Sequence, residues 1–573
     1  MLKYLKRYRK ECVLAPLFKM FEALLDLFVP LAVASIIDRG IGAGSAVHIW
    51  KMTGALVLLG LVGLAAAITA QYVAARAATG FAADVRHALF ARLTGLSFPD
   101  VDRLGTSAMI TRMTSDVNQA QTGVNMALRL LLRSPFVVLG AMIMAFTIDA
   151  RCALIFAAVI AALFAVVYAI MAVNIPMMRG VQRQLESVLG ATRENLSGAR
   201  VIRAFRREDA QFSEFKARNR ELTARQERAG RVSALLNPVT YVILNAAVIV
   251  LVRQGAIRVD GGALSTGQVV ALYNYMSQIL VELIKFASLT ITINKGWASW
   301  KRIADVLAMK PSMAAPEQPE KPADAGAPAV AFDHVTLAYP GSGSPALEDI
   351  DFTARRGQTV GIIGGTGAGK SSLAALIPRY YDVTAGSVRV DGVDVREYDL
   401  PSLRAKVGFV LQKAVLFKGT IRDNLRWGRP EATDGELLAA AQTAQAADVL
   451  AAKGGLDGEI AQNGGNLSGG QRQRLTIARA LVRRPDILVL DDSASALDMA
   501  TDARLRAAIA GLDYHPTVFI ISQRTASIMN ADLILVLEDG RLAGKGTHAE
   551  LMQSCEIYRE IYYSQFGMEG DAV

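Results

Sequence analysis

The sequence predicts a multi-domain membrane protein, in which a six-helix all-α transmembrane domain is followed by an α/β domain. The 573 residues are 52% hydrophobic and only 20% charged, with a mean hydropathy of +0.29, which is too apolar for one water-soluble fold. Six apolar stretches are each long enough to cross a bilayer, which takes about 20 helical residues. Beyond them, short strand-like runs alternate with helices. We expect a membrane domain at 1–309, a linker at 310–329 and the second domain at 330–573.

The apolar stretches are separated by connections of unequal length. The predicted spans lie near 14–37, 53–76, 127–148, 152–174, 234–256 and 268–290. The segments 77–126 and 175–232 are long and polar, and the second carries eleven Lys or Arg between Arg193 and Arg231. By the positive-inside rule these loops and both termini are cytoplasmic, which predicts a multi-pass protein of the cytoplasmic membrane. With few Gly or Pro, the loops are expected to continue the helices into the cytosol, with tips around 100–106 and 195–204.

Charge divides between the two halves. Up to Lys310 there are 36 Lys and Arg against 19 Asp and Glu, a net +17, whereas the remainder has 26 against 33, a net −7. The apolar half is therefore the basic half, as expected for positive residues beside membrane lipids, and a soluble nucleic-acid binder is excluded. The three cysteines are far apart, with no metal-ligand or disulfide pattern.

The second domain contains a glycine-rich loop with the pattern of a phosphate-binding site. It follows the strand TVGIIG, fits G-x-x-x-x-G-K-S, and comprises Gly364, Gly365, Thr366, Gly367, Ala368, Gly369, Lys370, Ser371 and the adjoining Ser372. In such a P-loop, backbone N–H groups surround phosphates, Lys370 reaches the β and γ oxygens, and the Ser371 hydroxyl binds Mg²⁺. The apolar strand at 487–490 ends in Asp491, whose carboxylate can hold the magnesium shell. The second domain is therefore predicted to be an α/β P-loop nucleotide-binding domain.

A second anion site is predicted at the start of another helix. Ser468, Gly469, Gly470 and Gln471 begin this helix, and helix N-termini attract anions. One P-loop cannot bring two such sites to one γ-phosphate. The second is therefore expected to serve a nucleotide held by another subunit.

These residues carry a resemblance to a known family. With LSGGQ at Leu467–Gln471 and ENLSGARVIRAFRRE at Glu194–Glu208, nearly the whole chain resembles a bacterial exporter half-transporter of the ATP-binding cassette (ABC) family. The resemblance implies that ATP and Mg²⁺ are the cofactors. It also implies that Tyr339 stacks on adenine, although a purely structural role for this tyrosine stays open. Gln412 would contact magnesium beside Ser371 and Asp491, and residues 495–498 would form the D-loop, which lies between the two subunits.

Two catalytic positions depart from the family pattern. Asp492 stands where the family has glutamate as general base, and Gln523 stands where it has the switch histidine. The aspartate carboxylate is one methylene further back, and a misplacement of about 1 Å can cost on the order of a hundredfold in rate. Glutamine cannot become cationic as histidine can. We therefore expect a weakly hydrolytic site in a heterodimer with a second ABC half-transporter; a less active homodimeric exporter and an ATP-gated channel or regulator are the alternatives.

The fused domains and six spans disfavour a soluble cassette ATPase and an importer. Membrane lipids are expected partners, while drugs, lipids and peptides all stay open as cargo.

Glu22 and Asp26 share one face of the first membrane helix. They could form an acidic patch that lines a cavity for cationic cargo. The interpretation we favour is that they lie in the cytoplasmic end of a long helix, solvated or paired with Arg129 or Arg133. Aromatic and Met residues of the sixth span, Tyr273, Tyr275 and Met276, are expected to pack between helices instead of lining an apolar cavity.

Overall fold

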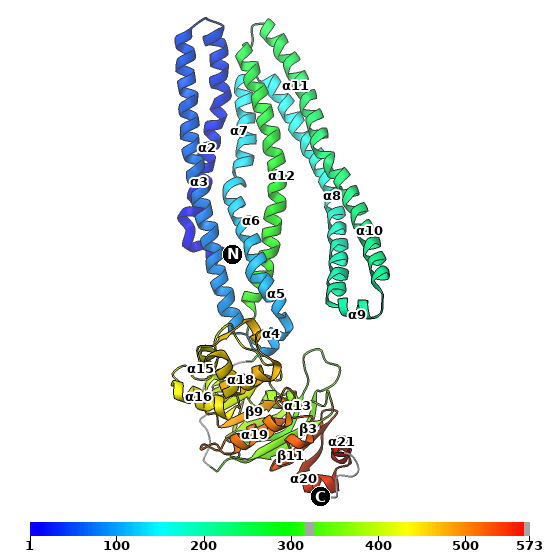
Figure 1. Cartoon of the computed structure of the whole chain (residues 1–573). Helices are drawn as coiled ribbons and strands as arrows, with labels where there is room; N and C mark the ends of the chain where they lie inside the picture. Colours follow the sequence, from blue (N-terminus) through cyan, green and yellow to red (C-terminus); the bar gives the residue numbers. More distant parts are fainter. Residues whose placement is uncertain (314–315, 317–325, 567–573) are drawn as a thin grey trace. The chain divides into compact units, whose positions relative to one another are not determined.

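The computed structural model describes residues 1–313, 316 and 326–566, and it divides into two compact units (Figure 1). Unit 1 contains Met1–Thr94 and Thr106–Met309, and unit 2 contains Gly95–Gly105 and Lys310–Val573. This division differs from the predicted domains at 95–105, which belong with the second unit. Most of the predicted linker, at 314–315 and 317–325, lies outside the described residues.

Unit 1 confirms the six predicted spans. Six helical stretches of the described chain are long and apolar enough to cross a membrane: Leu2–Ile41, Ala46–Thr94, Thr106–Ile148, Ala150–Ser197, Glu208–Asp260 and Thr266–Ala308. The helices run beyond the apolar segments, as expected for the long loops. Helices α8 (Ala150–Ser197) and α10 (Glu208–Ala234) lie side by side and are joined by the short α9 (Ala199–Ala204), which falls within the second predicted tip (Figure 1).

Small residues allow the helices of unit 1 to approach closely. The buried side of α3 (Ala46–Thr94) is a row of alanines, and α3 packs against α2 (Arg9–Ser35) and α6 (Val117–Leu130). Where α6 meets α12 (Thr266–Ala308), a Cβ on Gly123 would lie 3.0 Å from the Cα of Gly296. Close backbone contact of this kind is the main packing device between helices in lipid. The remaining helices of this unit are α1 (Leu2–Leu5), α5 (Thr106–Thr111), α7 (Arg133–Ile148) and α11 (Leu236–Asp260).

Arg133, at the start of α7, ties three helices together. Its guanidinium lies 3.9 Å from Glu22 and 3.0 Å from Asp26, both on α2, and 2.5 Å from Glu282 on α12. The predicted pairing of the two α2 acids with Arg133 is confirmed. Arg129 does not take part, because its guanidinium donates to the Gln71 side-chain oxygen at 3.0 Å. The α2 acids are thus part of a mixed ionic cluster and not an isolated acidic patch.

The sixth span packs largely as expected. Tyr275 and Met276 are buried in the core of unit 1, and the Tyr275 hydroxyl donates to the Leu27 carbonyl at 2.6 Å. Tyr273 is instead exposed, beside a shallow groove between α11 and α12. Its predicted packing role is therefore wrong, because its side chain points away from the buried side of α12.

Unit 2 is an α/β domain with a separate antiparallel sheet, as predicted. The main sheet has the order β12-β11-β3-β10-β9-β6, parallel except for β12, and the antiparallel sheet has the order β2-β1-β4-β5. The predicted Asp391-Gly392 turn joins β4 to β5, with both residues at positive φ, as a two-residue hairpin turn requires. The main-sheet strands are β3 (Thr359–Gly364), β6 (Val407–Val410), β9 (Ile487–Asp491), β10 (Thr517–Ile521), β11 (Leu533–Glu538) and β12 (Arg541–Gly546). The others are β1 (Val330–Leu337), β2 (Leu347–Ala354), β4 (Ala385–Val390), β5 (Val393–Asp394), β7 (Gly419–Thr420) and β8 (Glu459–Ile460).

Both faces of the main sheet are buried. Alternate residues of β9 enter different cores: Ile487 and Val489 pack with the antiparallel sheet, whereas Leu488 and Leu490 pack with the helices. This explains the continuous apolar run of the strand, since parallel strands covered on both sides need no polar face. The helices of unit 2 are α13 (Lys370–Leu376), α14 (Leu400–Lys406), α15 (Ile421–Arg426), α16 (Asp434–Thr443), α17 (Ala447–Lys453), α18 (Gly469–Val482), α19 (Met499–Ala510), α20 (His548–Ser554) and α21 (Glu556–Phe566).

Helix α4 (Phe98–Leu104), at the first predicted tip, packs within unit 2. The Phe98 ring stacks on Tyr380 with centroids 4.3 Å apart, and the Arg404 guanidinium lies over both rings. The Tyr381 hydroxyl donates to Asp102. Aromatic stacking and cation–π contacts each contribute on the order of 1 kcal/mol, so α4 is held by several weak contacts together.

Asp100 caps this helix and generates a stability prediction. The buried carboxylate accepts from the Ser312 N–H at 2.9 Å, the Ser97 N–H at 3.3 Å and the Ser97 hydroxyl. Asp100→Ala removes the shared acceptor of three donors on Ser97 and Ser312, so we expect a loss of about 1–3 kcal/mol in thermal unfolding of the purified chain. The matched control, Asp209→Ala, removes an exposed acid at the start of α10 and is expected to change stability by under about 0.5 kcal/mol.

The same contacts set the pH dependence of this effect. Burial would raise the pKa of Asp100, but the hydrogen bonds from Ser97 and Ser312 outweigh it and lower the pKa below its ordinary value. The advantage of wild type over Asp100→Ala is therefore complete above the ordinary aspartate pKa and is lost as pH falls through the lowered one. Equal unfolding temperatures of the two proteins at neutral pH would show that the cap is not stabilising.

Candidate nucleotide site

Three neighbouring strands of the main sheet end beside one pocket. The P-loop follows β3, Asp491 is the last residue of β9, and Gln523 comes two residues after β10. Because β3, β10 and β9 are parallel, their carboxyl ends lie at one edge of the sheet, where α/β proteins bind ligands. The pocket has a volume of about 380 Å³. Its lining residues are Tyr339, Ala346, Thr366, Gly367, Gly369, Lys370, Ser371, Ser372, Gln412, Asp491, Asp492, Ile521 and Gln523.

The P-loop has the conformation that glycine permits. Gly367 and Gly369 have φ of +86° and +92°, and a Cβ on Gly369 would lie 2.6 Å from the Ala346 carbonyl oxygen. The Lys370 ammonium donates to the carbonyl oxygens of Gly364 and Gly365 at 2.9 and 2.6 Å, so these two glycines shape the loop without lining the pocket. Ala368 likewise does not line the pocket, because its side chain is buried in the core.

The electrostatics of the pocket suit a polyphosphate with a divalent cation. Burial lowers the pKa of Lys370, while Asp492 and Asp491 oppose this by stabilising its positive charge. Burial raises the pKa of Asp491, and the hydrogen bond from Ser371 partly offsets this. Burial thus disfavours the charged forms of Lys370 and Asp491. Phosphate oxygens beside Lys370 and a divalent cation beside Asp491 would stabilise these charged forms.

The three residues predicted to bind magnesium all line this pocket and carry side-chain oxygen atoms. The Ser371 hydroxyl donates to Asp491 Oδ1 at 2.9 Å, which puts two oxygen ligands side by side at the pocket wall. Gln412 lines the same pocket, and its Nε2 donates to Asp492 Oδ2 at 3.2 Å. An all-oxygen donor set next to a phosphate site fits Mg²⁺. Ser371, Asp491 and Gln412 would hold the ion, which would neutralise charge on the phosphate oxygens.

Asp492 and Gln523, which are predicted to depart from the family pattern, line the same pocket. Asp492 has a φ of +46°, a conformation that aspartate tolerates better than most residues, and its N–H donates to the Ile521 carbonyl at 3.0 Å. Gln523 lines the pocket at the end of the neighbouring strand. The structure therefore brings Asp492 and Gln523, the two positions predicted to be degenerate, to the same pocket as the P-loop.

The signature residues lie apart from this pocket. Ser468 caps α18: its hydroxyl accepts from the Gln471 N–H at 3.3 Å, and its own N–H donates to the Gln471 side chain at 2.9 Å. Ser468 and Gly469 are exposed, and none of Ser468, Gly469, Gly470 and Gln471 lines the pocket. A Cβ on Gly470 would lie 2.9 Å from the Ala496 carbonyl oxygen, so the signature packs against residues 495–498. The helix end that is predicted to be a second anion site thus faces solvent within unit 2.

Tyr339 lines the pocket but is also anchored. Its hydroxyl donates to Ser372 at 3.0 Å, and its ring contacts Tyr381 edge-on with centroids 5.1 Å apart. Through Tyr381, the adenine-platform candidate is linked to Asp102 of α4. The structural and the ligand-binding roles of this tyrosine are therefore compatible.

Sequence reasoning missed three residues of this site. Ala346 and Ile521 contribute backbone and apolar surface to the pocket. Gln565 of α21 donates from Nε2 to the Gln523 carbonyl at 2.7 Å and accepts from the Thr525 N–H at 2.8 Å. No local motif marks this contact, because its partners are about forty positions apart in the chain.

The position of Lys370 leads to a binding prediction. On binding a nucleotide, its ammonium would exchange two carbonyl oxygens for phosphate oxygens, and a charge-assisted hydrogen bond contributes about 1.5–3 kcal/mol. Lys370→Ala is therefore expected to weaken ATP binding at least about tenfold, measured by titration with a fluorescent ATP analogue. The control Lys545→Ala, at an exposed lysine of the same unit that pairs with Asp351, should leave the affinity unchanged. Equal affinities of wild type and Lys370→Ala would contradict the site.

Comparison with known proteins agrees with this geometry. A family model described as "ABC transporter transmembrane region" matches residues 12–283, and one described as "ABC transporter" matches residues 347–495. An uncharacterised ABC transporter ATP-binding protein of Mycobacterium tuberculosis (strain ATCC 25618 / H37Rv) is 36% identical over 568 residues, covering 98% of this chain and 97% of its own. The ATP-dependent lipid A-core flippase of Albidiferax ferrireducens is 29% identical over 567 residues, covering 98% and 97%.

The fold comparison extends over both units. A solved structure of a bacterial Atm1-family ABC exporter with ATP bound matches with a TM-score of 0.80 and 25% sequence identity, covering 98% of each chain. The order of six membrane-length helices followed by an α/β nucleotide-binding unit is therefore shared with an exporter. The chain belongs to the ABC transporter family and has the fold of an ABC exporter.

Proposed function

We propose that this chain is one half of a heterodimeric ABC exporter that binds ATP at a weakly hydrolytic site. The observation that carries the proposal is that Asp492 and Gln523 line the same pocket as the intact P-loop and Asp491. Binding groups are retained, whereas both groups expected to act on the attacking water are replaced. Binding without efficient hydrolysis is the expected result.

Each replacement weakens a different step. A general base must lie within hydrogen-bond reach of the proton it removes, and the shorter side chain of Asp492 holds its carboxylate further from the γ-phosphate than glutamate would. Its Oδ2 also accepts from Gln412. Gln523 can donate a hydrogen bond from its amide but cannot carry a positive charge toward the developing negative charge. The two losses act on the same composite site.

The partner completes the arrangement. The exposed Ser468 and the helix end behind it are free to bind the γ-phosphate of a nucleotide on another subunit. In a head-to-tail dimer this signature would complete the partner's site, where a glutamate base and a switch histidine are expected. The partner's signature would in turn cover the ATP held by Lys370 and Ser371, with Mg²⁺ at Ser371, Asp491 and Gln412.

Transport requires that closure of the two nucleotide-binding units of the dimer on each other moves the membrane helices. Helix α4 is fixed to unit 2 through Phe98, Asp100 and Asp102, so movement of unit 2 displaces the ends of α3 and α5. Alternating access of a central cavity is the expected result. The chain would lie in the cytoplasmic membrane with both termini and unit 2 in the cytoplasm, consistent with its basic loops. The lipid-linked name of one relative and the apolar spans favour amphipathic cargo, among lipids, drugs and peptides.

Hydrolysis measurements test this assignment. The purified chain alone should turn over ATP slowly, and the double variant Asp492→Glu, Gln523→His should be at least about tenfold faster, because it restores the base and the switch. The single variant Asp491→Asn, which removes a magnesium ligand, is the negative control. Rapid hydrolysis by the unmodified chain alone would contradict the proposal and favour an active homodimer.

A complementary prediction concerns the chain in complex with the second half-transporter that the proposal requires. In the co-purified complex, Asp492→Asn should leave ATP turnover within about twofold, whereas Ser468→Arg should abolish most of it, because the arginine side chain blocks the partner's site. The reverse pattern would place the active site on this chain. Ionic current through bilayers without dependence on hydrolysis would indicate a channel instead of a pump.

A further inference from the structure

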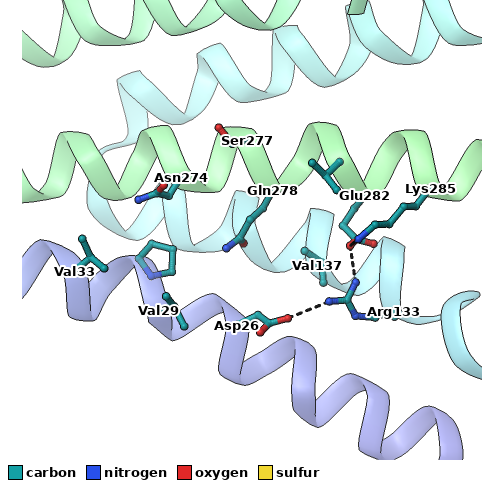
Figure 2. A pocket seen from close by; sticks show the side chains of 12 residues that line it. Asp26, Val29, Val33, Arg133, Val137, Asn274, Ser277, Gln278, Glu282 and Lys285 are labelled. Atoms are coloured by element: carbon teal, nitrogen blue, oxygen red, sulfur yellow. Dashed lines mark hydrogen bonds and ion pairs between the residues drawn. The ribbon is translucent and has the colours of Figure 1, made fainter. Parts of the chain in front are cut away.

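A cavity of about 540 Å³ lies among α2, α7 and α12 of unit 1 (Figure 2). One part of its wall is apolar and consists of Val29, Pro30, Val33, Val137 and Val281. The rest is polar, with Asn274, Ser277 and Gln278 between ionic groups. All lining residues fall within the spans predicted from the sequence, which places this polar surface at membrane depth. Ionisable groups at such depth are usually functional.

The ionic groups of the cavity differ in how available they are. Glu282 and Arg133 are 5% and 12% exposed and pair with one another, and Glu282 also accepts from Ser134 at 2.8 Å. Asp26 and Lys285 are 45% and 50% exposed. Asp26 pairs with the buried Arg133, and Lys285 pairs with the buried Glu282 at 3.1 Å. Each of the two exposed groups still has hydrogen-bonding atoms that face the cavity. One carboxylate and one ammonium therefore remain accessible to a ligand.

The charges in the wall balance. Asp26 and Glu282 are negative, and Arg133 and Lys285 are positive. A ligand with a single charge would gain one favourable contact and meet an unfavourable one nearby, whereas a ligand with both charges can satisfy Asp26 and Lys285 together. The isolated acidic patch for cationic cargo considered from the sequence does not match this balance.

Gln278 adds an independent indication of a ligand. Its amide oxygen is buried and accepts no hydrogen bond from the described residues. The side chain extends from α12 into the space between α12 and α2 (Figure 2). A buried acceptor without a donor is costly. Rotation of the side chain would bring this oxygen into the cavity, where a donor on the ligand, such as an ammonium N–H, would satisfy it.

We propose that this cavity binds an amphipathic zwitterion, with the ligand's ammonium group at Asp26 and Gln278, its acidic group at Lys285 and its apolar part against the valines. This inference deepens the proposed function, on which it rests, by naming the class of cargo. The acidic group can be the phosphate of a lipid headgroup or the carboxylate of a short peptide, because both offer oxygen acceptors to the Lys285 ammonium.

The first test compares three amphiphiles with one tail on the unmodified full chain, by isothermal titration in maltoside micelles with protein-free micelles as the blank. Dodecyl phosphoethanolamine carries both charges, its N-acetyl derivative lacks the cation, and dodecyl aminoethyl ether lacks the phosphate. We expect the zwitterion to bind at least about tenfold tighter than either analogue, since each loses a charge-assisted hydrogen bond. Equal affinities of all three would overturn the proposal, without any variant being needed.

The second test assigns the two charges to residues. Asp26→Asn should remove the preference over the N-acetyl derivative, and Lys285→Gln should remove the preference over the ether. Matched controls are Asp305→Asn and Lys295→Gln, which change exposed residues of α12 outside the cavity and should leave all affinities unchanged. Unchanged preferences in the cavity variants would overturn the proposal.

The source of the ligand is resolved by adding trileucine with free termini. Binding of trileucine with the same dependence on Asp26 and Lys285 supports a peptide, and binding of the phosphoethanolamine alone supports a lipid headgroup. All titrations are made without ATP on this chain alone. A failure of the hydrolysis predictions would therefore leave these affinities unchanged, and a failure here would leave the hydrolysis pattern unchanged.

Discussion

The pairing of Arg133 with three carboxylates is the interaction on which the membrane unit depends. An unpaired guanidinium among apolar helices is very unfavourable, so Glu22, Asp26 and Glu282 fix where α2, α7 and α12 can lie relative to one another. Such a buried cluster adds little net stability, because desolvation offsets the attraction between the charges. Its effect is geometric: it sets the register of three helices and leaves a polar wall between them.

In the nucleotide unit, the corresponding constraint is the parallel sheet. Strands β3, β9 and β10 end at one edge, so residues more than one hundred positions apart, such as Ser371 and Asp491, meet within hydrogen-bond distance. Strand β3 leads into the P-loop, Asp491 and Asp492 follow one another at the end of β9, and Gln523 comes after β10, so the pocket combines groups from three strand ends.

Much of this architecture could be predicted from the sequence, because its signals are local. The lengths of the apolar stretches predicted the six spans. The P-loop spacing and the apolar run before Asp491 predicted the pocket that contains Lys370 and Ser371. The docking of α4 on unit 2 had no such signal, since it depends on Phe98 meeting Tyr380 almost three hundred residues later. The Arg133 cluster was only partly foreseen, because Glu282 lies on a helix whose face cannot be chosen from composition alone.

The contact between Gln565 and the loop after β10 has a practical consequence for protein engineering. Two hydrogen bonds join the last described helix to the backbone at Gln523 and Thr525, so anything attached after α21 is mechanically connected to the edge of the nucleotide pocket. A bulky reporter fused at the carboxyl end would pull on this loop whenever it pulls on α21. Affinity handles and fluorophores are therefore better placed at the amino end, which belongs to unit 1.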